Sequence, residues 1–458
     1  MNKTAQTLSL LIEAIGAQAV LTGDAINQRH YSDWSHHAPT CPAALIIPKT
    51  TSQLATALSI CNTQRQAVVA QGGNTGLTAA AEPKKDQMVI SLEKMVGIEE
   101  IDQAAATMTV LAGTPLITIQ EQAKQAGFLF PLDLGARGSC QIGGNISTNA
   151  GGNNVIHYGM CRDMVLGLEV VLANGRILNL MNKMIKNNSG YDLKQCFIGS
   201  EGTLGIITRA ILKLYPKPKE ITTLLCALPD YSSVVSLLRR IERGITTPQA
   251  YEIMWQDFYQ LSVSWLENCQ APLNDKYPFF VLIDIESHYN QVSDVLEEAI
   301  QNGEILDAIA ASSEQQAHHL WKIREATAEF PARMKPLNFD ISIPIGEIGA
   351  FAEQCKKRIN EYWPEAASYF FGHIADSNLH LTIDLNTLPE STHLLDIEQL
   401  IYSEVAHMQG SISAEHGIGL IKKDFLHYTV PAENIAVMKQ LKQALDPNNI
   451  LNPGKIFD

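Results

Sequence analysis

The sequence lacks the features that mark several large classes of protein. It has 34 Lys and Arg against 48 Asp and Glu, a formal net charge of −14, so it has no excess of positive charge with which to bind nucleic acid or anionic lipid unspecifically. A small molecule is therefore the better partner hypothesis, and no nucleic-acid partner is expected. The eight cysteines form no CxxC pair and show no zinc-finger spacing, which favours a reduced, cytoplasmic setting.

Long hydrophobic runs are also absent. No apolar stretch reaches the roughly 18 to 20 residues that a membrane-crossing helix needs. Near the N-terminus, TLSLLIEAIG (7–16) places Leu8, Leu11, Ile12 and Ile15 at helical spacing and predicts an amphipathic helix rather than a signal peptide. We therefore expect a cytoplasmic protein without a transmembrane segment, which at most is peripheral to the inner face of the membrane.

The length and composition predict an ordinary globular protein of two or three domains. The chain has 458 residues, of which 46% are hydrophobic and 18% charged. Its first part alternates apolar stretches with helical patterns, which is typical of a layered fold of helices and sheets. The expected strands lie at 43–48, 67–71, 88–92 and 108–113, and the expected helices at 51–63 and about 115–126.

The remaining elements follow from local patterns. Residues 166–180 predict a hairpin in which Asn174 and Gly175 supply positive φ angles. A strand within 202–220 ends in a Pro/Lys segment that we interpret as a domain boundary. From about 220 to 410 the order strand, helix, strand, strand, helix, strand predicts a separate α+β cap, and a last helix is expected at about 432–445.

Three glycine-rich segments are concentrated in the first half of the chain. They are QGGNTGL (71–77), GARGSCQIGGNISTNAGGNN (135–154) and GSEGTLGI (199–206). Glycines after a strand can expose backbone N–H groups to a diphosphate, although the first segment alone is equally consistent with a simple turn. Long loops without regular structure are usually functional. Together, the three favour a large dinucleotide bound between two subdomains.

Six segments carry a resemblance to a known family. They are PLDLGARGSCQIGGN (131–145), STNAGG (147–152), FIGSEGTLGIIT (197–208), GHIADSNLHL (372–381), SAEHGIG (413–419) and LDPNNILNP (445–453). From about residue 30 to the C-terminus, the sequence resembles the FAD-linked D-2-hydroxy-acid dehydrogenases of the vanillyl-alcohol-oxidase (PCMH-type) flavin fold. This family includes D-2-hydroxyglutarate and D-lactate dehydrogenases.

The resemblance implies an α+β fold and a domain plan. An FAD-binding domain of two subdomains is expected at 1–217, with its PCMH-type core at about 38–217. A cap domain for the substrate follows at 218–410, and a C-terminal helical segment at 411–458 returns to the flavin domain and completes the active site. Where covalent relatives often carry a linking His, this chain has Asn74, so the resemblance implies non-covalent FAD.

The resemblance also implies which residues bind FAD. They are Gln71, Gly72, Gly73, Asn74, Thr75, Gly76, Leu77, Pro131, Leu134, Gly138, Ser139, Gly143, Gly144, Ser147, Thr148, Asn149, Gly151, Gly152, Tyr158, Gly159, Glu201, Gly202, Gly205, Ile206, Ile207 and Asn452.

His373 and His380 flank a turn-like segment, Ala375–Asn378. If the flanks pair as a hairpin symmetric about that turn, the two imidazoles lie directly opposite one another. The spacing alone favours two ordinary histidines over a metal site. Glu415 is available as a third ligand, and two His plus one carboxylate suit Zn²⁺, Mn²⁺ or Fe²⁺. The resemblance implies a divalent metal, zinc first among these, on His373, His380 and Glu415.

Two further residues receive catalytic hypotheses. His416 beside Glu415 is either a buried, hydrogen-bonded imidazole or the general base that accepts the hydroxyl proton of a 2-hydroxy acid. Arg324 lies on an expected helix, where a lone Arg is often simply solvated. The resemblance makes Arg324 the clamp for a substrate carboxylate, for which a guanidinium is well shaped.

Three positions depart from the D-2-hydroxyglutarate dehydrogenase pattern. Ala328 stands in place of Thr, Asn338 in place of Lys, and Thr382 in place of Asn. Residues of this set hold the distal carboxylate in the resembled enzymes. Both a dicarboxylate and a monocarboxylate therefore remain hypotheses for the substrate of this chain. Lys335 is near enough in sequence to substitute for the missing Lys. Asn338 and Thr382, with Arg324, are the candidate substrate residues.

The leading hypothesis is an FAD- and metal-dependent dehydrogenase that oxidises a D-2-hydroxy acid to the 2-oxo acid. Its electrons would pass to a quinone, a cytochrome or an electron-transferring flavoprotein, and a homodimer is one alternative for its assembly. Competing hypotheses are a D-lactate or other monocarboxylate dehydrogenase, another enzyme class on the same fold, such as an ether-lipid synthase, and a non-catalytic flavin-binding protein. The other enzyme class should not need the two His and one Glu, and a non-catalytic protein would have no reason to place His416 beside a metal ligand.

Overall fold

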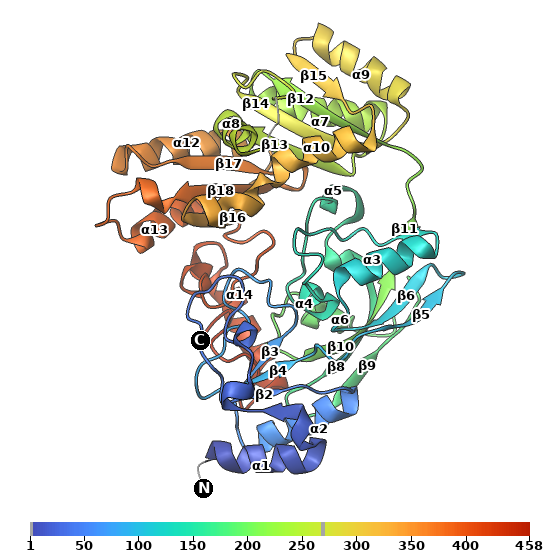
Figure 1. The fold of residues 1–458 in the computed structure, drawn as a ribbon, viewed down its shortest axis with the longest axis vertical. Helices are drawn as coiled ribbons and strands as arrows, with labels where there is room; N and C mark the ends of the chain where they lie inside the picture. The colour runs from blue at the N-terminus through green and yellow to red at the C-terminus, as the bar shows by residue number, and fades with distance from the viewer. Residues whose placement is uncertain (1–2, 267–270) are drawn as a thin grey trace. The chain divides into compact units, whose positions relative to one another are not determined.

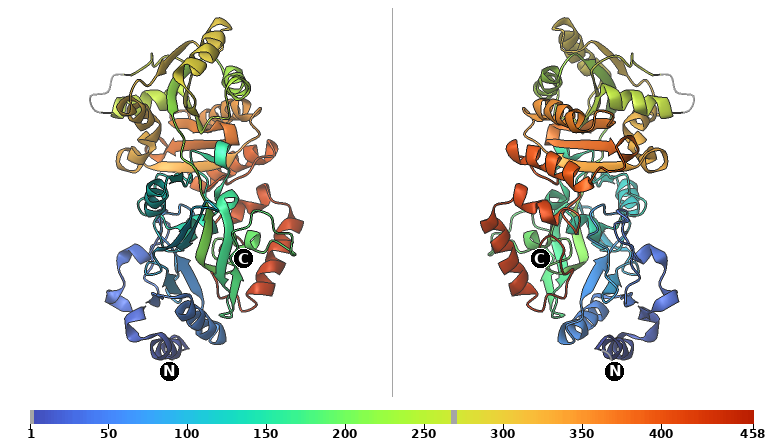
Figure 2. Two further views of the ribbon diagram at one scale, coloured as in Figure 1. Left: turned by 90° about the vertical axis from the view of Figure 1, so that its right-hand side faces the viewer. Right: turned by 90° about the vertical axis from the view of Figure 1, so that its left-hand side faces the viewer.

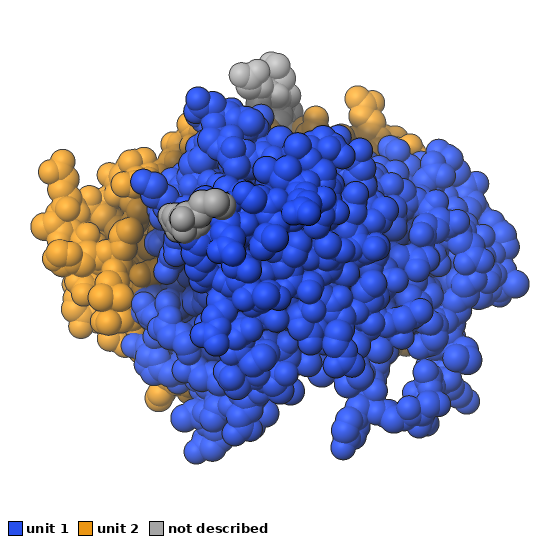
Figure 3. All heavy atoms as spheres, turned by 90° about the horizontal axis from the view of Figure 1, so that it is seen from below, with its two compact units in different colours: residues 1–151, 160–217, 415–458 blue, residues 152–159, 218–414 orange. Residues whose placement is uncertain are grey.

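The computed structural model describes residues 3–266 and 271–458 (Figure 1). The chain forms two compact units, which Figure 3 colours separately. The first unit contains residues 1–151, 160–217 and 415–458. The second contains residues 152–159 and 218–414.

The first unit begins with a small sheet in the order β1-β2-β4-β3. Strands β2, β4 and β3 are parallel, and β1 is antiparallel to β2. The helix α2 connects β2 to β3, and Thr50 caps it by accepting a hydrogen bond from the Gln53 backbone N–H. The elements are α1 (Lys3–Ile15), β1 (Val20–Leu21), β2 (Ala44–Ile46), α2 (Thr51–Thr63), β3 (Val68–Gln71) and β4 (Met88–Ser91).

A second, antiparallel sheet of the first unit has the order β5-β6-β10-β8-β9. Its strands are β5 (Ile98–Asp102), β6 (Thr107–Leu111), β8 (Val165–Val171), β9 (Ile177–Leu180) and β10 (Ile206–Lys213). The same unit contains β7 (Phe128–Leu129), which pairs with β11 (Tyr215–Pro216), and the helices α3 (Leu116–Gln125), α4 (Ile142–Ser147), α6 (Lys194–Phe197) and α14 (Ala432–Leu445). The two sheets are the two expected subdomains.

The turn of the predicted hairpin differs in one detail. Strands β8 and β9 do pair, with Val171 opposite Ile177, but of the two expected residues only Gly175 has a positive φ, of 81°. Asn174 instead accepts a hydrogen bond from the Arg176 backbone N–H. The connection is a three-residue loop closed between Leu172 and Arg176, which needs one left-handed residue rather than two.

The second unit is built on a seven-stranded sheet in the order β15-β12-β14-β13-β17-β18-β16, and every neighbouring pair is antiparallel. The strands are β12 (Ile221–Leu228), β13 (Ala250–Trp255), β14 (Phe279–Glu286), β15 (Asp307–Ala310), β16 (Pro336–Ser342), β17 (Ser368–His373) and β18 (Asn378–Asp384). The order strand, helix, strand, strand, helix, strand expected for 220–410 was wrong, because a helix follows each of the strands β12, β13, β14 and β15. The pattern was hard to read because α8 follows β13 without a turn residue between them and β15 is only four residues long.

Helices cover both faces of this sheet (Figures 1 and 2). On one face, Phe258 of α8 and Ile323 of α10 belong to a buried cluster with the strand residues Met254 and Leu282. On the other face, the Tyr251 hydroxyl donates to a carbonyl of α7. The helices of the second unit are α5 (Val155–Tyr158), α7 (Tyr231–Gly244), α8 (Gln256–Trp265), α9 (Tyr289–Gln301), α10 (Glu314–Arg324), α11 (Phe330–Arg333), α12 (Ile348–Tyr362) and α13 (Leu394–His407).

The cysteines of the described residues are all free, at positions 41, 61, 140, 161, 196, 226 and 355, and Cys269 lies outside the described residues. Within the described ranges, none of the helices combines the length and apolarity that a bilayer crossing requires.

Candidate active site

The first glycine loop of the first unit leaves the carboxyl end of β3 and comes into backbone contact with the second. A Cβ atom added to Gly73 would lie 2.1 Å from the carbonyl oxygen of Ser139, so no larger residue fits there without displacing one of the loops. Gly135, Gly138 and Gly144 have open space where a Cβ would point. The two loops are therefore in close contact at Gly73, whereas open space lies next to Gly135, Gly138 and Gly144.

Three buried amide oxygens of these loops have no hydrogen-bond partner in the described part of the chain. They are Asn74 Oδ1, Gln141 Oε1 and Asn145 Oδ1. Buried polar atoms are normally satisfied, so these acceptors fit a ligand that offers several hydroxyl or N–H donors. FAD has such donors in its ribityl chain, its ribose and its two ring systems. The residues present therefore fit the flavin cofactor that the sequence implies.

Asn452 and Glu201 connect the loops to the C-terminal segment of the same unit. The Asn452 amide accepts from the Ala70 backbone N–H (2.9 Å) and donates to the Glu201 carbonyl (2.7 Å). The buried Glu201 carboxylate accepts from the backbone N–H groups of Ile418 (2.7 Å) and Gly419 (2.8 Å). Burial raises the pKa of Glu201 despite these bonds. Both expected cofactor residues thus hold backbone segments in place.

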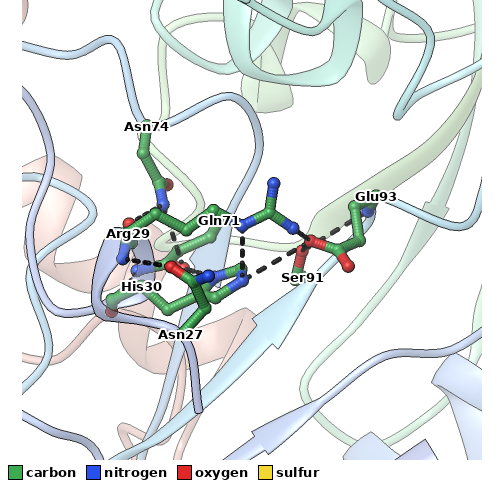
Figure 4. A network of polar contacts seen from close by, with 7 residues as sticks. All are labelled: Asn27, Arg29, His30, Gln71, Asn74, Ser91 and Glu93. Atoms are coloured by element: carbon green, nitrogen blue, oxygen red, sulfur yellow. Dashed lines mark hydrogen bonds and ion pairs between the residues drawn. The ribbon is translucent and has the colours of Figure 1, made fainter.

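His30, which no sequence pattern singled out, lies beneath the first glycine loop (Figure 4). Its Nδ1 is 2.8 Å from Gln71 Oε1, and the Asn74 amide donates to the same oxygen at 3.2 Å. Burial lowers the pKa of His30, although Gln71 and Glu93 oppose this effect. A neutral imidazole therefore anchors the two loop residues at the end of β3.

In the second unit, each predicted metal-binding histidine faces a buried carboxylate on the adjacent strand. His373 on β17 is directly opposite Glu252 on β13, and His380 on β18 is directly opposite Asp340 on β16. The His373 Nδ1 is 2.5 Å from Glu252 Oε1, and the His380 Nδ1 is 3.8 Å from Asp340 Oδ1. All four side chains lie on one face of the sheet, because directly paired residues share a face.

The predicted register of the two histidines was wrong. Strands β17 and β18 form a hairpin, but His380 is opposite Phe371, not His373. The offset of two residues follows from the short helical turn Ile374–Asp376 and the left-handed Ser377, with φ of 71°. An offset of two keeps side chains on the same face, so the rings still meet, with centroids 5.3 Å apart.

Arg324 is not a solvated helix residue. It is the last residue of α10, only 7% of its surface is exposed, and its Nε donates to Glu252 Oε2 at 2.8 Å. Its guanidinium lies over the Phe371 ring, 4.9 Å from the centroid. The alternative of a solvated arginine is excluded, and Arg324 shares one carboxylate with His373.

The candidate substrate residues Asn338 and Thr382 are also paired across strands. They are directly opposite in register, and the Thr382 hydroxyl donates to Asn338 Oδ1 at 2.7 Å. Asn338 is exposed and Thr382 is buried. Ala328 lies in a short helical turn and Lys335 just before β16, and both are exposed.

The remaining predicted residues are divided between the units. Gly152, Tyr158 and Gly159 belong to the short segment 152–159 of the second unit, which is held there by a hydrogen bond between His157 Nδ1 and the Thr247 carbonyl (2.9 Å). Glu415 and His416 begin the C-terminal segment of the first unit.

Within the first unit, Glu415 packs against the second glycine loop. A Cβ on Gly151 would lie 2.4 Å from Glu415 Oε1. The backbone carbonyl of His416 accepts from the Thr78 hydroxyl at 3.4 Å. Gly151 therefore gives Glu415 room beside a segment expected to bind FAD.

Glu252 and Asp340 are the residues that sequence reasoning missed in the second unit. Both lie inside apolar strand patterns, AYEIMW and NFDISI, and both are buried. A carboxylate in the middle of a buried strand requires a partner, and this signal was available in the sequence. The residues that pair with Glu252 and Asp340 could not be identified from the sequence, because they depend on the order of the strands in the sheet.

The fold and these loops define a flavin-binding oxidoreductase of the PCMH type. A likeness in fold to a solved structure of p-cresol methylhydroxylase with substrate bound covers 100% of this chain and 98% of that chain, with a TM-score of 0.76 and 17% identity. The family described as "FAD binding domain" matches residues 42–181, and "FAD linked oxidases, C-terminal domain" matches residues 217–456.

The chain is also similar over nearly its whole length to curated proteins. It is 36% identical over 447 residues to the D-2-hydroxyglutarate dehydrogenase of Stutzerimonas stutzeri (strain A1501), which covers 96% of each chain. It is 36% identical over 433 residues to the mitochondrial D-2-hydroxyglutarate dehydrogenase of Bos taurus, covering 93% of this chain and 78% of the other. The chain belongs to the FAD-linked oxidase family and is an FAD-dependent oxidoreductase acting on CH–OH groups.

Proposed function

We propose that this protein oxidises a D-2-hydroxy acid to the 2-oxo acid, with D-2-hydroxyglutarate, the substrate named for its relatives, as the first candidate. The observation that carries the proposal is the cluster of the buried residues Arg324, Glu252 and His373 with the partly buried His380 on one face of a sheet, in a chain with an FAD-binding domain. The guanidinium of Arg324 can bind the carboxylate of a hydroxy acid, and the imidazoles of His373 and His380 can hold a metal beside its hydroxyl group. Neither the buried guanidinium nor the pair of imidazoles has an evident use in a protein that only stores a flavin.

The first unit is the proposed FAD-binding part, together with the 152–159 segment. FAD, when bound, accepts the hydride that leaves the substrate Cα. The residues proposed to hold it are the set named from the sequence, and the three buried amide oxygens without partners among the described residues support that set. Asn74, in place of a linking His, makes the attachment non-covalent.

We assign a divalent metal, zinc first, to His373, His380 and Glu415. Glu415 is bonded to Ala414, whose backbone N–H donates to the Asp340 carbonyl (3.4 Å) beside His380 in the second unit. Two imidazoles and one carboxylate form a donor set that zinc, manganese and iron all accept. When bound, the metal polarises the substrate hydroxyl and lowers its pKa.

Arg324 and His416 are the proposed catalytic residues. The Nε of Arg324 is held by Glu252, so its two terminal NH₂ groups are the ones that would bind the substrate carboxylate in the bidentate manner of guanidinium groups. A ring nitrogen of His416 accepts the hydroxyl proton. An imidazole suits this step because its ordinary pKa is near neutrality.

A monocarboxylate such as D-lactate is the second candidate substrate, and a specific observation favours it. The Asn338 amide oxygen is engaged by Thr382 (2.7 Å), and neither residue carries the positive charge that a distal carboxylate would favour. Lys335 is the cation nearest in sequence. We further propose a cytoplasmic protein, peripheral to the inner face of the membrane or free of it, with an external electron acceptor and a homodimeric assembly.

The proposed function is tested by a dye-linked assay with both enantiomers of small 2-hydroxy acids. Oxidation of the D enantiomers alone, by a yellow protein that releases its flavin on acid precipitation, is the expected result. A protein that takes up no FAD, or that oxidises none of these acids, would contradict it.

A further inference from the structure

We propose that Glu252 is a positioning residue that holds the metal-ligand imidazole of His373 and the carboxylate-binding guanidinium of Arg324 with its two oxygens. The inference rests on the proposed function, which assigns those roles to His373 and Arg324. Glu252 is only 1% exposed, and its Oε1 and Oε2 lie 2.5 Å from His373 Nδ1 and 2.8 Å from Arg324 Nε.

The bond to Glu252 determines which nitrogen of His373 can bind a cation. A carboxylate only accepts hydrogen bonds, so Nδ1 must carry the proton. The Nε2 lone pair is then the one that can ligate a metal. A carboxylate behind a ligating imidazole fixes the ring orientation and increases its basicity, and removing such a partner typically weakens metal binding 10- to 100-fold.

The same carboxylate orients Arg324. Because Nε is engaged by Glu252, the guanidinium presents its terminal NH₂ edge elsewhere, and in the described part of the chain that edge has no hydrogen-bond partner. Phe371 lies under the guanidinium and directly opposite His380 in the hairpin. The guanidinium plane is therefore fixed by two contacts, one polar and one aromatic.

A single acceptor shared by two donors makes the two binding functions depend on one residue. Glutamine at position 252 would keep the shape but would place an NH₂ group against either Arg324, whose bond is then lost, or His373, whose Nδ1 must then give up its proton to Nε2, the nitrogen needed for the metal. The bond that remains is made to a neutral amide and is no longer assisted by the carboxylate charge, so both binding constants are affected. The loss of a charge-assisted hydrogen bond to either group corresponds to roughly a 10- to 100-fold change in affinity.

The experiment compares the parent, E252Q and D284N, each with FAD bound. Asp284 is a matched control because it is a buried carboxylate on the adjacent strand β14, on the same sheet face. Its partners are Thr223 (2.5 Å) and Trp321 (2.9 Å) rather than His373 or Arg324. Two constants are measured: the Kd of Zn²⁺ for the metal-free protein, by competition with a chromophoric chelator, and the Kd of 2-oxoglutarate, from the flavin absorbance of the metal-free protein.

We expect E252Q to weaken Zn²⁺ binding 10- to 100-fold and 2-oxoglutarate binding at least about 10-fold, while D284N changes each less than about threefold. An E252Q protein that matches the parent in both constants overturns the inference. A D284N protein that loses as much as E252Q also overturns it, since the effect would then be that of any buried carboxylate.

Two further outcomes are informative. If E252Q does not fold, E252D is measured in its place; its carboxylate is one methylene shorter, so at least one constant should weaken about 10-fold, and no change in either overturns the inference. A parent that binds no Zn²⁺ contradicts the metal site of the proposed function, and the inference with it. A parent that binds Zn²⁺ and a variant that binds it equally well contradict only the role of Glu252.

Discussion

His416 and Glu415 are adjacent residues with different proposed tasks, and single substitutions can separate them. H416N keeps a hydrogen-bonding side chain of similar width but cannot accept a proton at neutral pH. We expect it to retain FAD and metal and to lose flavin reduction by two or more orders of magnitude, the usual size of an acid–base contribution. Stopped-flow measurement of flavin reduction tests this. A variant that reduces its flavin at the parental rate returns His416 to a structural role.

Asn338 is the residue at which substrate preference should be adjustable. Its side chain is exposed and hydrogen-bonded to Thr382, so a longer side chain has room. N338K adds a cation, and we expect kcat/KM for D-2-hydroxyglutarate relative to D-lactate to rise by one to two powers of ten, the value of a charge-assisted hydrogen bond. If the parent already prefers the dicarboxylate strongly and N338K changes nothing, Lys335 is the next residue to substitute.

The contact between two glycine loops can be tested by a pair of Gly→Ala substitutions. G73A places a methyl group 2.1 Å from the Ser139 carbonyl, whereas G135A, in the second of the two loops, meets nothing within 4 Å. Neither glycine has a positive φ, so the comparison isolates close approach from backbone conformation. We expect G73A to lower FAD content and the thermal midpoint of unfolding and G135A to leave both near the parental values. If G73A and G135A have the same FAD content and the same thermal midpoint, the two loops can move apart without loss of stability, and the prediction is wrong.

Sequence patterns predicted elements more accurately than the pairings between them. The helices α2 and α14 occur at the predicted residues, because apolar periodicity and capping residues are local. The two-residue offset between His373 and His380 was missed because it depends on the backbone of Ser377, which carries no glycine or asparagine signal. The shared carboxylate of Glu252 was missed because β13 and β17, more than a hundred residues apart, become neighbours only in the assembled sheet.

In the whole molecule, the proposed metal ligand His380 and most of the proposed FAD-binding loops belong to different units, whereas the third proposed ligand, Glu415, belongs to the same unit as the loops. His380 is on the sheet of the second unit, and the three glycine-rich loops belong, except for residues 152–159, to the first. We therefore expect H380A to lose the divalent metal and activity while keeping parental FAD content. Elemental analysis and the flavin absorbance of the same sample measure both. Loss of FAD together with the metal would mean that the two sites are not separable.

The stability of the first unit should depend on pH through Lys455 near the C-terminus. This lysine is 3% exposed, and its ammonium donates to the carbonyls of Ala79 and Glu82, both at 2.7 Å. Burial lowers its pKa from 10.5 to about 8, although Asp33, Glu82 and Glu201 act in the opposite direction. Between about pH 8 and pH 10.5 the unfolded chain therefore binds a proton that the folded chain has released.

Because the unfolded state binds more protons in this window, the contribution of Lys455 to the free energy of unfolding rises with pH there and is constant below about pH 8. The K455M variant lacks this contribution. We expect the stability of the parent minus that of K455M, from urea unfolding followed by flavin fluorescence and circular dichroism, to increase by about 2 to 3 kcal/mol between pH 7 and pH 10. K85M is the control, because Lys85 is an exposed lysine close in sequence to Glu82 and is not among the charges that shift the pKa of Lys455. A difference that stays flat or falls over this range would show that the Lys455 ammonium is not held in a buried environment.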